Sequence, residues 1–312
     1  MKKIKILLFM ALMVWQMTIL GSEEKKFNVG ITQIIEHPSL DLSREGFETA
    51  LMDKGIWGRV SIEIKIAQGD FATSQMIAKG FVDSKKDLIL AISTPSSQTA
   101  FNATKEIPIV ITAVTDPVAA GLIGENITGT SDPMPIAKQV ALIKEVLPNV
   151  ETIGLIYNTS EQNSVISIER IKDECGKAGL KYVETGVTSV SDIVPAMGSL
   201  LEKVDLVFLT TDNMISSSAI LVIELANNKG IPVLGGDAAH IPLGALMTET
   251  IDFYQIGYRA GEMAVEVLSG KNPSELPIEE PKENQIIVNK KIAEKYNVDL
   301  SIDILKNAII IE

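Results

Sequence analysis

The sequence predicts an α/β protein in which two lobes each hold a parallel sheet covered by helices on both faces. Short apolar runs, such as 88–92, 153–157 and 206–209, alternate with segments of helical period. The runs are β-branched and apolar on both faces, as parallel strands buried between two helical layers must be. The chain has 312 residues, more than one core comfortably serves, so two lobes are expected.

In the first lobe every expected strand leads into a helix or a polar turn. The isoleucines at 62, 64 and 66 alternate as in a strand, and Gly55 closes the first helix as a C-terminal glycine. This alternation is the βαβ pattern of a doubly wound sheet. The expected elements are strands at 26–35, 60–67, 88–92 and 107–114, and helices at 42–54 and 71–81.

The segment 126–133 breaks this rhythm, and we interpret it as the first crossover between lobes. A second βα series follows, and the chain then returns to the first lobe through 245–248 before a Pro- and Glu-rich surface connection at 272–283. We therefore assign 27–130 and 246–284 to lobe 1, and 131–245 and 285–312 to lobe 2. The expected elements after the first crossover are helices at 135–147 and 254–269, and strands at 153–157, 206–209 and 285–288.

Residues 1–22 have the order of a secretory signal peptide: three lysines, an uncharged run at 6–20, and the small residues Gly21 and Ser22. A membrane anchor is the alternative, but the apolar run of roughly 15 residues is shorter than the roughly 20 that a span requires. We predict an exported, periplasmic or extracytoplasmic protein. No cysteine lies near the expected cleavage site to carry a lipid, since the only cysteine is Cys175.

Composition narrows the range of partners. The formal charge is -12, and no basic cluster follows Lys26, so nucleic acid and anionic lipid are poor candidate partners. A single cysteine allows no internal disulfide, and stability must come from core burial. Cys175 shares a helical face with Ile168, Ile171 and Ala178, which predicts a buried, inert thiol.

Catalytic equipment is scarce. The two histidines, His37 and His240, belong to no metal-ligand spacing, and no nucleophile elbow, phosphate loop or dinucleotide-binding glycine motif follows a strand. We therefore predict a protein that is not an enzyme and that uses no metal or cofactor. Polar turns at the carboxyl ends of the strands, where open α/β sheets bind ligands, predict a small-molecule site instead.

The turn at 94–98 suits a ligand carboxylate. Thr94 is expected to cap a helix that begins at Pro95, with the hydroxyls of Ser96 and Ser97 in its first turn. A helix N-terminus offers free N–H groups and the positive end of the helix dipole. An ordinary capped helix that binds nothing is the alternative interpretation.

Acidic turns at the other strand ends suit a ligand ammonium group. Glu36 and Asp116 fall in the first lobe, and Glu161, Asp212 and Asp237 in the second, so a ligand that touches both sets would bridge the lobes. Each carboxylate alone could equally be a cap or a solvated turn residue. The full set of predicted ligand-binding residues is Gln33, Glu36, His37, Thr94, Ser96, Ser97, Thr115, Asp116, Asn158, Glu161, Asn163, Ser164, Thr211, Asp212, Asn213 and Asp237.

Several motifs in order resemble one family, the substrate-binding proteins of ABC importers of the tryptophan- and tyrosine-binding type. The resemblance covers essentially the whole chain after residue 26. It implies two Rossmann-like lobes joined by three hinge crossovers (the type I periplasmic-binding-protein fold), with an aromatic amino acid in the cleft. The matching motifs are TQIIEHPSLD at 32–41, TPSSQ at 94–98, TAVTDP at 112–117, GTSD at 129–132, YNTSEQNS at 157–164 and TDN at 211–213.

The sequence thus predicts a solute receptor that binds tryptophan, tyrosine or phenylalanine, closes around it by hinge motion and docks as a monomer on an ABC permease. Tyr157, Phe253 and Tyr254 are candidates for stacking on the aromatic ring, and each could equally lie in the core. A sugar or nucleoside receptor on the same fold remains open. A regulator would need a DNA-binding motif ahead of residue 27, where the signal peptide stands.

Overall fold

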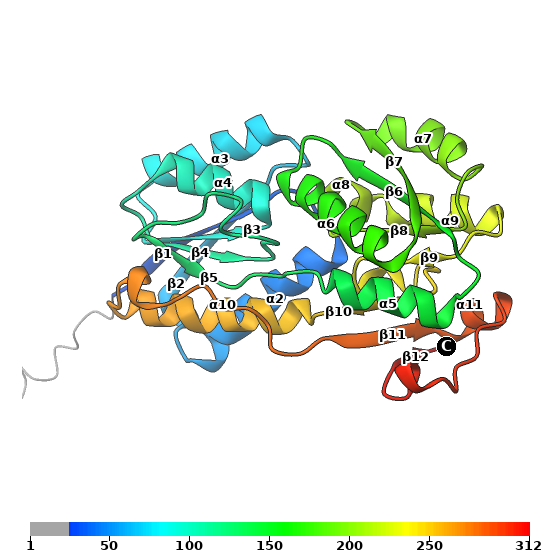
Figure 1. Ribbon diagram of the computed structural model, residues 1–312. Helices are drawn as coiled ribbons and strands as arrows, with labels where there is room; N and C mark the ends of the chain where they lie inside the picture. The colour runs from blue at the N-terminus through cyan, green and yellow to red at the C-terminus, as the bar shows by residue number, and fades with distance from the viewer. Residues whose placement is uncertain (1–24) are drawn as a thin grey trace, which may run out of the picture.

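The computed structural model describes residues 25–312, which form two α/β lobes side by side (Figure 1). The predicted signal peptide lies outside the described residues. Among residues 25–312, no helix has both the length and the apolar character needed to cross a bilayer.

Lobe 1 is built on a five-stranded parallel sheet. Its helices are α2 (Pro38–Asp53), α3 (Phe71–Asp83), α4 (Thr94–Ala103) and α10 (Phe253–Leu268). The strands lie in the order β2 (Val60–Ile66), β1 (Phe27–Gln33), β3 (Leu88–Ile92), β4 (Ile109–Thr112) and β5 (Ile127–Gly129).

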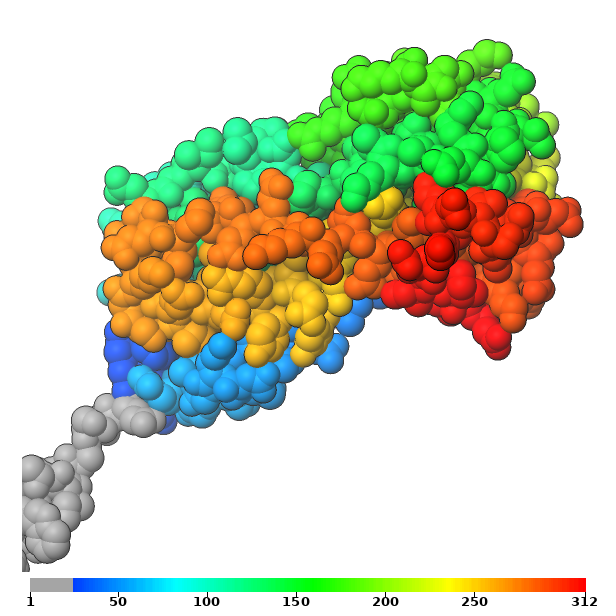
Figure 2. All heavy atoms as spheres, turned by 60° about the horizontal axis from the view of Figure 1, so that its bottom comes forward, coloured from blue at the N-terminus to red at the C-terminus, as the bar shows by residue number. Residues whose placement is uncertain are grey.

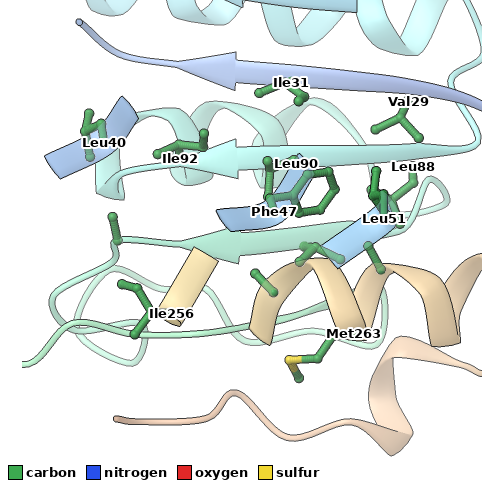
Figure 3. Packing of buried hydrophobic residues seen from close by; sticks show 14 of the residues in the cluster. Val29, Ile31, Leu40, Phe47, Leu51, Leu88, Leu90, Ile92, Ile256 and Met263 are labelled. Atoms are coloured by element: carbon green, nitrogen blue, oxygen red, sulfur yellow. The ribbon is translucent and has the colours of Figure 1, made fainter. Parts of the chain in front are cut away.

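The lobe 1 core joins one sheet face to two helices that are distant in sequence. Figure 3 shows Val29 and Leu90 of the strands, Phe47 of α2 and Met263 of α10 in one cluster. These four side chains are fully buried. Burial of such side chains contributes roughly 1.5 to 3 kcal/mol each, so this contact fixes α10 to lobe 1 although α10 comes late in the chain.

Lobe 2 is built on a seven-stranded sheet that is parallel except where β10 and β11 pair antiparallel. Its helices are α5 (Ile136–Val146), α6 (Gln162–Ala178), α7 (Ile193–Leu200), α8 (Asn213–Ser217), α9 (Ala219–Asn228) and α11 (Lys290–Lys295). The strand order is β12 (Ile309–Ile311), β11 (Gln285–Asn289), β10 (Met247–Thr250), β9 (Val233–Leu234), β8 (Leu206–Phe208), β6 (Thr152–Asn158) and β7 (Lys181–Val187).

Short 3₁₀ helices occupy several turns: η1 (Trp57–Arg59), η2 (Val190–Asp192), η3 (Ala238–His240), η4 (Pro273–Glu275) and η5 (Asp303–Leu305). Cys175 is buried and free, as expected, and burial raises the pKa of its thiol to about 11.

One lobe boundary differs from the expectation. Residues 246–250 were assigned to lobe 1, but β10 pairs with β9 and β11 inside the lobe 2 sheet, Met247 lying opposite both Leu234 and Val288. The apolar sequence of this segment predicts a buried strand but not the lobe in which it lies. Hydrogen bonding to neighbouring strands decides which sheet it joins. The chain crosses to lobe 1 just after this strand, and α10 begins at Phe253.

The lobes are joined by three crossovers, at 130–135, 251–252 and 277–284. The first and third run side by side, since Ser131 N donates to Glu279 O and Glu279 N donates to Gly129 O, both at 2.9 Å. In Figure 2 the orange third crossover runs along the surface toward the red C-terminal segment. The hinge is therefore a paired ribbon rather than two independent linkers.

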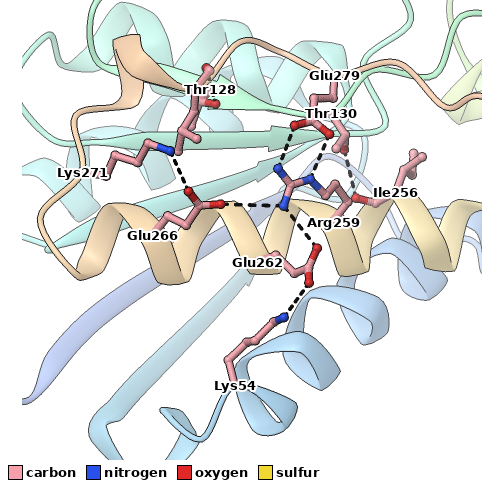
Figure 4. A network of polar contacts seen from close by, with 10 residues as sticks. Lys54, Thr128, Thr130, Ile256, Arg259, Glu262, Glu266, Lys271 and Glu279 are labelled. Atoms are coloured by element: carbon pink, nitrogen blue, oxygen red, sulfur yellow. Dashed lines mark hydrogen bonds and ion pairs between the residues drawn. The ribbon is translucent and has the colours of Figure 1, made fainter.

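An ion-pair network fastens this ribbon to α10 (Figure 4). Arg259 donates two hydrogen bonds to the Glu279 carboxylate, at 2.9 and 2.7 Å, in the fork geometry that favours arginine. Glu262 accepts from Arg259 at 3.2 Å and also pairs at 2.7 Å with Lys54, the residue that follows α2. The third crossover is thereby held to lobe 1 at its first residues.

Candidate functional site

A small enclosed cavity lies where the carboxyl ends of the two sheets face each other. Its volume is about 10 Å³, room for about one water molecule and far below the usual range for small-molecule pockets, so an amino acid fits only if the walls move apart. Both lobes and the hinge contribute to its walls. The lining residues are His37, Leu40, Ala113, Thr115, Asp132, Asn163, Thr211, Asn213, Asp237 and Phe253.

Six of these ten belong to the set of ligand-binding residues predicted from the sequence, and Phe253 is one of the three aromatic candidates. His37 and Thr115 come from lobe 1, and each contacts lobe 2 directly: His37 Nε2 lies 3.4 Å from Asn213 Oδ1, and Thr115 Oγ1 lies 3.3 Å from Thr211 Oγ1. The lobes therefore touch across the cavity. The six are His37, Thr115, Asn163, Thr211, Asn213 and Asp237.

Two predicted carboxylates support the site rather than line it. Glu161 accepts from the backbone N–H groups of Asn213 and Met214, both at 3.2 Å. Asp212 caps α8 by accepting from Ile215 N at 2.9 Å, and it also accepts from Asn158 N at 2.5 Å. Burial, together with the Glu161 carboxylate, raises the pKa of Asp212. The start of α8 is thus already filled by acidic groups of the chain itself.

The start of α4 is different. The helix begins at Thr94, one residue earlier than expected, and its N-cap is Ser93 at φ 83°, whose side chain makes no capping hydrogen bond. The hydroxyls of Thr94 and Ser96 are buried without a hydrogen-bond partner. Ser97 is satisfied, because its Oγ donates to Ser93 O at 2.7 Å. Compared with the start of α8, the start of α4 has no acidic cap.

Asp132 is the important residue that sequence reasoning missed. It follows β5 in the first crossover, lines the cavity, and is 3% exposed. Burial raises the pKa of Asp132 to about 8; the Asp237 carboxylate adds to the rise and a hydrogen bond from Thr115 opposes it. Asp132 stands in the GTSD motif at 129–132, whose position at a strand end was the available signal.

Three buried polar atoms on the cavity residues have no hydrogen-bond partner. They are Asp132 Oδ1, Asn163 Oδ1 and His37 Nδ1. The Nε2 contact to an amide oxygen makes Nε2 the protonated nitrogen, which leaves Nδ1 as an acceptor. Burial lowers the pKa of His37, which favours this neutral form. The cavity thus offers three unused acceptors, which suits a ligand group rich in N–H donors.

Other predicted residues lie outside the cavity lining. Glu36 is exposed, and Gln33 bonds locally to Ile35 O, Asp41 and Arg44. Asp116 accepts from Ala119 N at 2.8 Å and pairs with Arg170 of lobe 2. Asn158 and Ser164 are buried under the site, among the side chains that surround Glu161 and Asp212. Residues that follow strands meet at one sheet edge, but only some of them point into the cleft.

Of the three aromatic residues considered for stacking on the ligand, only one lines the cavity. Phe253 lines the cavity at the first turn of α10. Tyr157 packs against the lobe 2 core, and Tyr254 contacts the ring of Tyr258, with centroids 6.4 Å apart. Phe253, with Leu40 and Ala113, gives the cavity one apolar side. In the part of the chain that the structure describes, no group of three His, Cys, Asp or Glu side chains could hold a metal ion.

Comparison with known proteins identifies the family. The family model described as ABC transporter substrate binding protein matches residues 28–311. The chain belongs to this family. The family is one of binding proteins rather than enzymes, as the sequence predicted. The fold is accordingly the type I periplasmic-binding-protein fold of two Rossmann-like lobes.

Individual relatives agree with this assignment. A tyrosine-binding protein of Clostridioides difficile is 44% identical over 292 residues, which cover 91% of this chain and 85% of that protein. A solved ABC domain from Streptococcus pneumonia in complex with L-Trp is 33% identical, covers 92% of this chain and 100% of its own, and superposes with a TM-score of 0.89.

The arrangement of the lobes is the closed one. The ligand-free, open structure of a substrate binding protein from Clostridium difficile is 40% identical and covers 92% of this chain and 99% of its own, yet its TM-score is only 0.69. The L-Trp complex is less similar in sequence and more similar in shape. The contacts across the cavity agree, since they join the two lobes directly.

Proposed function

We propose that the protein is the extracytoplasmic receptor of an ABC importer and binds an aromatic amino acid between its lobes. The observation that carries the proposal is the set of unused buried acceptors around Asp132 in a cavity that also has an apolar side. An α-amino acid with an apolar side chain matches both features. The related tyrosine-binding protein and the L-Trp complex support the aromatic class.

The ligand ammonium group is assigned to Asp132 and Asn163. An ammonium carries three donors and no acceptor, and Asp132 Oδ1 and Asn163 Oδ1 are acceptors without partners. The carboxylate of Asp237 lies in the same lining and adds negative charge. This set spans the hinge and lobe 2, so an ammonium bound there also favours closure.

The ligand carboxylate is assigned to the start of α4. The alternative helix start, that of α8, already holds the carboxylates of Asp212 and Glu161. At α4 the hydroxyls of Thr94 and Ser96 have no hydrogen-bond partner and lie at the positive end of the helix dipole; neither residue lines the cavity, so the carboxylate reaches them only if the cavity walls move apart. A carboxylate there satisfies donors that the protein leaves unpaired. The ligand side chain is then left to Leu40 and Phe253.

Thermal unfolding in the presence of each of the twenty amino acids tests the ligand class. Tyrosine, tryptophan or phenylalanine at about 100 times its Kd should add about 2.7 kcal/mol and raise Tm. Ribose and nucleosides serve as controls and should leave Tm unchanged. A shift with a sugar and none with any amino acid would contradict the proposal.

Substitutions at α4 test the carboxylate assignment. Ser96→Ala should weaken binding of the responding amino acid by roughly 1 to 3 kcal/mol, because a hydrogen bond to a charged group is lost. Ser97→Ala is the matched control, since Ser97 Oγ already donates to a backbone carbonyl and its removal should affect stability more than affinity. Isothermal titration of both folded variants decides the assignment, and equal affinities would move the carboxylate elsewhere.

The proposal also covers the location, the membrane partner and the oligomeric state of the protein. Substrate-binding proteins of this family act outside the cytoplasm, and the permease of an ABC importer is the expected membrane partner. We propose export by the segment 1–22, without a lipid anchor, and a monomer in solution. N-terminal sequencing of the secreted protein and light scattering of the purified protein test these two points.

A further inference from the structure

Helix α6 of lobe 2 makes a second set of contacts with lobe 1, outside the ligand cavity. Gln162 begins the helix and Arg170 lies eight residues later, a rise of about 12 Å. Eight residues are close to two turns and a quarter, so both side chains lie on one broad face of the helix. Both reach the turn at 116–120 or the neighbouring helix α4.

The first contact is an ion pair between Arg170 and Asp116. Arg170 Nη2 donates to Asp116 Oδ2, while Asp116 Oδ1 accepts from Ala119 N at 2.8 Å. The turn therefore fixes the carboxylate before Arg170 meets it. The Asp116 side chain is 20% exposed and that of Arg170 is 45% exposed, so the pair is partly open to solvent and is weakened by salt.

The second contact is an amide bridge made by Gln162. Its Nε2 donates to Ala119 O at 2.6 Å, and its Oε1 accepts from Gln98 Nε2 of α4. Gln98 Nε2 also donates to Ala120 O at 3.2 Å, which anchors it within lobe 1. None of Gln98, Asp116, Gln162 and Arg170 lines the cavity.

We propose that these four residues form an interlobe latch that stabilises the closed state without touching the ligand. Three of their contacts join one lobe to the other, Arg170 to Asp116, Gln162 to Ala119 and Gln162 to Gln98, and these exist only when the lobes are closed. If only a fraction of the receptor is in the binding-competent state, the apparent Kd equals the intrinsic Kd divided by that fraction. By raising the population of the closed state, the latch increases the affinity for the ligand and the time that the ligand stays bound. The identity of that ligand rests on the proposed function.

The expected size follows from the exposure of the ion pair. Exposed pairs measured by double-mutant cycles correspond to roughly a two- to fivefold change in an equilibrium constant. Arg170→Gln should therefore raise the dissociation rate of the bound aromatic amino acid about two- to fivefold. The affinity of the wild type should also fall with added salt more steeply than that of the variant, since screening weakens the pair.

A double-mutant cycle separates the latch from general damage. Asp116→Asn keeps an acceptor for Ala119 N and removes only the charge. The latch requires that Asp116→Asn and Arg170→Gln have similar effects and that the double variant be no worse than either. Lys172→Gln is the matched control, because Lys172 lies on the same helix but pairs with Glu169 and Glu184 inside lobe 2. Additive effects, or an equal effect of Lys172→Gln, would overturn the proposal.

A ligand-free measurement keeps this test independent of the ligand assignment. Fluorescent labels at Lys79→Cys of α3 and Ser199→Cys of α7, both exposed positions on opposite lobes, report the interlobe distance. Without ligand, Arg170→Gln should lower the closed fraction relative to the wild type and to Lys172→Gln. Equal closed fractions in all three proteins would overturn the latch, whereas failure of every amino acid to bind the wild type would overturn only the proposed function.

Discussion

The carboxyl group of Asp132 combines burial, a missing hydrogen-bond partner and a raised pKa in one side chain. A buried carboxyl group without a cation nearby holds its proton, because low dielectric disfavours the charged form. A ligand ammonium supplies the missing positive charge. Without ligand the Asp132 carboxyl group is therefore neutral below about pH 8, and it ionises when it pairs with the ligand ammonium.

Binding should consequently depend on pH with a defined sign. The pKa of Asp132 is about 8 without ligand, so below pH 8 the carboxyl group must lose a proton before it pairs with an ammonium. Affinity should rise as pH increases toward 8, by up to about tenfold per unit. Calorimetry in buffers of different ionisation enthalpy should detect the released proton. In Asp132→Asn this pH slope should disappear and affinity should fall.

The same shift predicts the stability of the ligand-free protein. The pKa of Asp132 in the folded protein lies above the ordinary value of 3.8, so the folded state holds this proton more tightly than the unfolded state does. The free energy of unfolding is therefore highest below about pH 4 and falls as pH rises to about 8. Asp132→Asn removes this dependence, and its Tm should exceed that of the wild type at pH 8 by several degrees. A pH profile of Tm with the same slope in both proteins would show that Asp132 is ionised in the empty site.

At the scale of elements, the contact of α2 with α10 fixes the hinge. A Cβ on Gly257 would lie 1.9 Å from Ser43 O, and one on Gly46 would lie 2.1 Å from Tyr254 O. The two helix backbones therefore touch, and only glycine permits this approach. Phe253, which lines the cavity, stands one turn before Gly257. The packing of a distant helix thus positions one wall of the ligand site.

Alanine substitutions should separate close packing from helix propensity. Gly257→Ala should lower the free energy of unfolding by about 1 to 3 kcal/mol, because the added methyl forces the helices apart. Gly176→Ala, inside α6 with nothing within 4 Å of its Cβ, should raise stability by about 0.5 to 1 kcal/mol. Urea unfolding measures both. A neutral Gly257→Ala would mean that α10 shifts without cost.

At the scale of the whole molecule, the cavity is complete only when the lobes are closed. His37 and Thr115 approach lobe 2 directly, and the cavity takes side chains from both lobes and from the hinge. Only the closed state offers all these contacts to one ligand. The ligand's differential affinity for that state is what drives closure.

Small-angle scattering should detect this motion. The radius of gyration should decrease when a bound aromatic amino acid closes the lobes, and the Asp132→Asn variant should stay at the ligand-free value under the same conditions. Binding is confirmed in each sample by calorimetry. An unchanged radius in a saturated wild-type sample would place the ligand on one lobe and contradict the account of closure.

The sequence by itself determined the layers of the fold and the edge at which the ligand binds. Apolar, β-branched runs such as 88–92 predict buried parallel strands from local pattern alone, and the observed strand is Leu88–Ile92. Polar turns at strand ends meet by topology, which brought His37, Thr115 and Asp237 to one cavity. The motif resemblance added the family, which the comparison confirms.

Tertiary structure alone decided which of these polar groups are free to bind. Glu161 and Asp212 read like Asp132 in sequence, but their oxygens are used by α8 whereas Asp132 Oδ1 is not. The sheet that β10 joins also depended on pairing with β9 and β11. Hydrogen-bond satisfaction and strand pairing are set by partners far apart in the chain, and no local pattern records them.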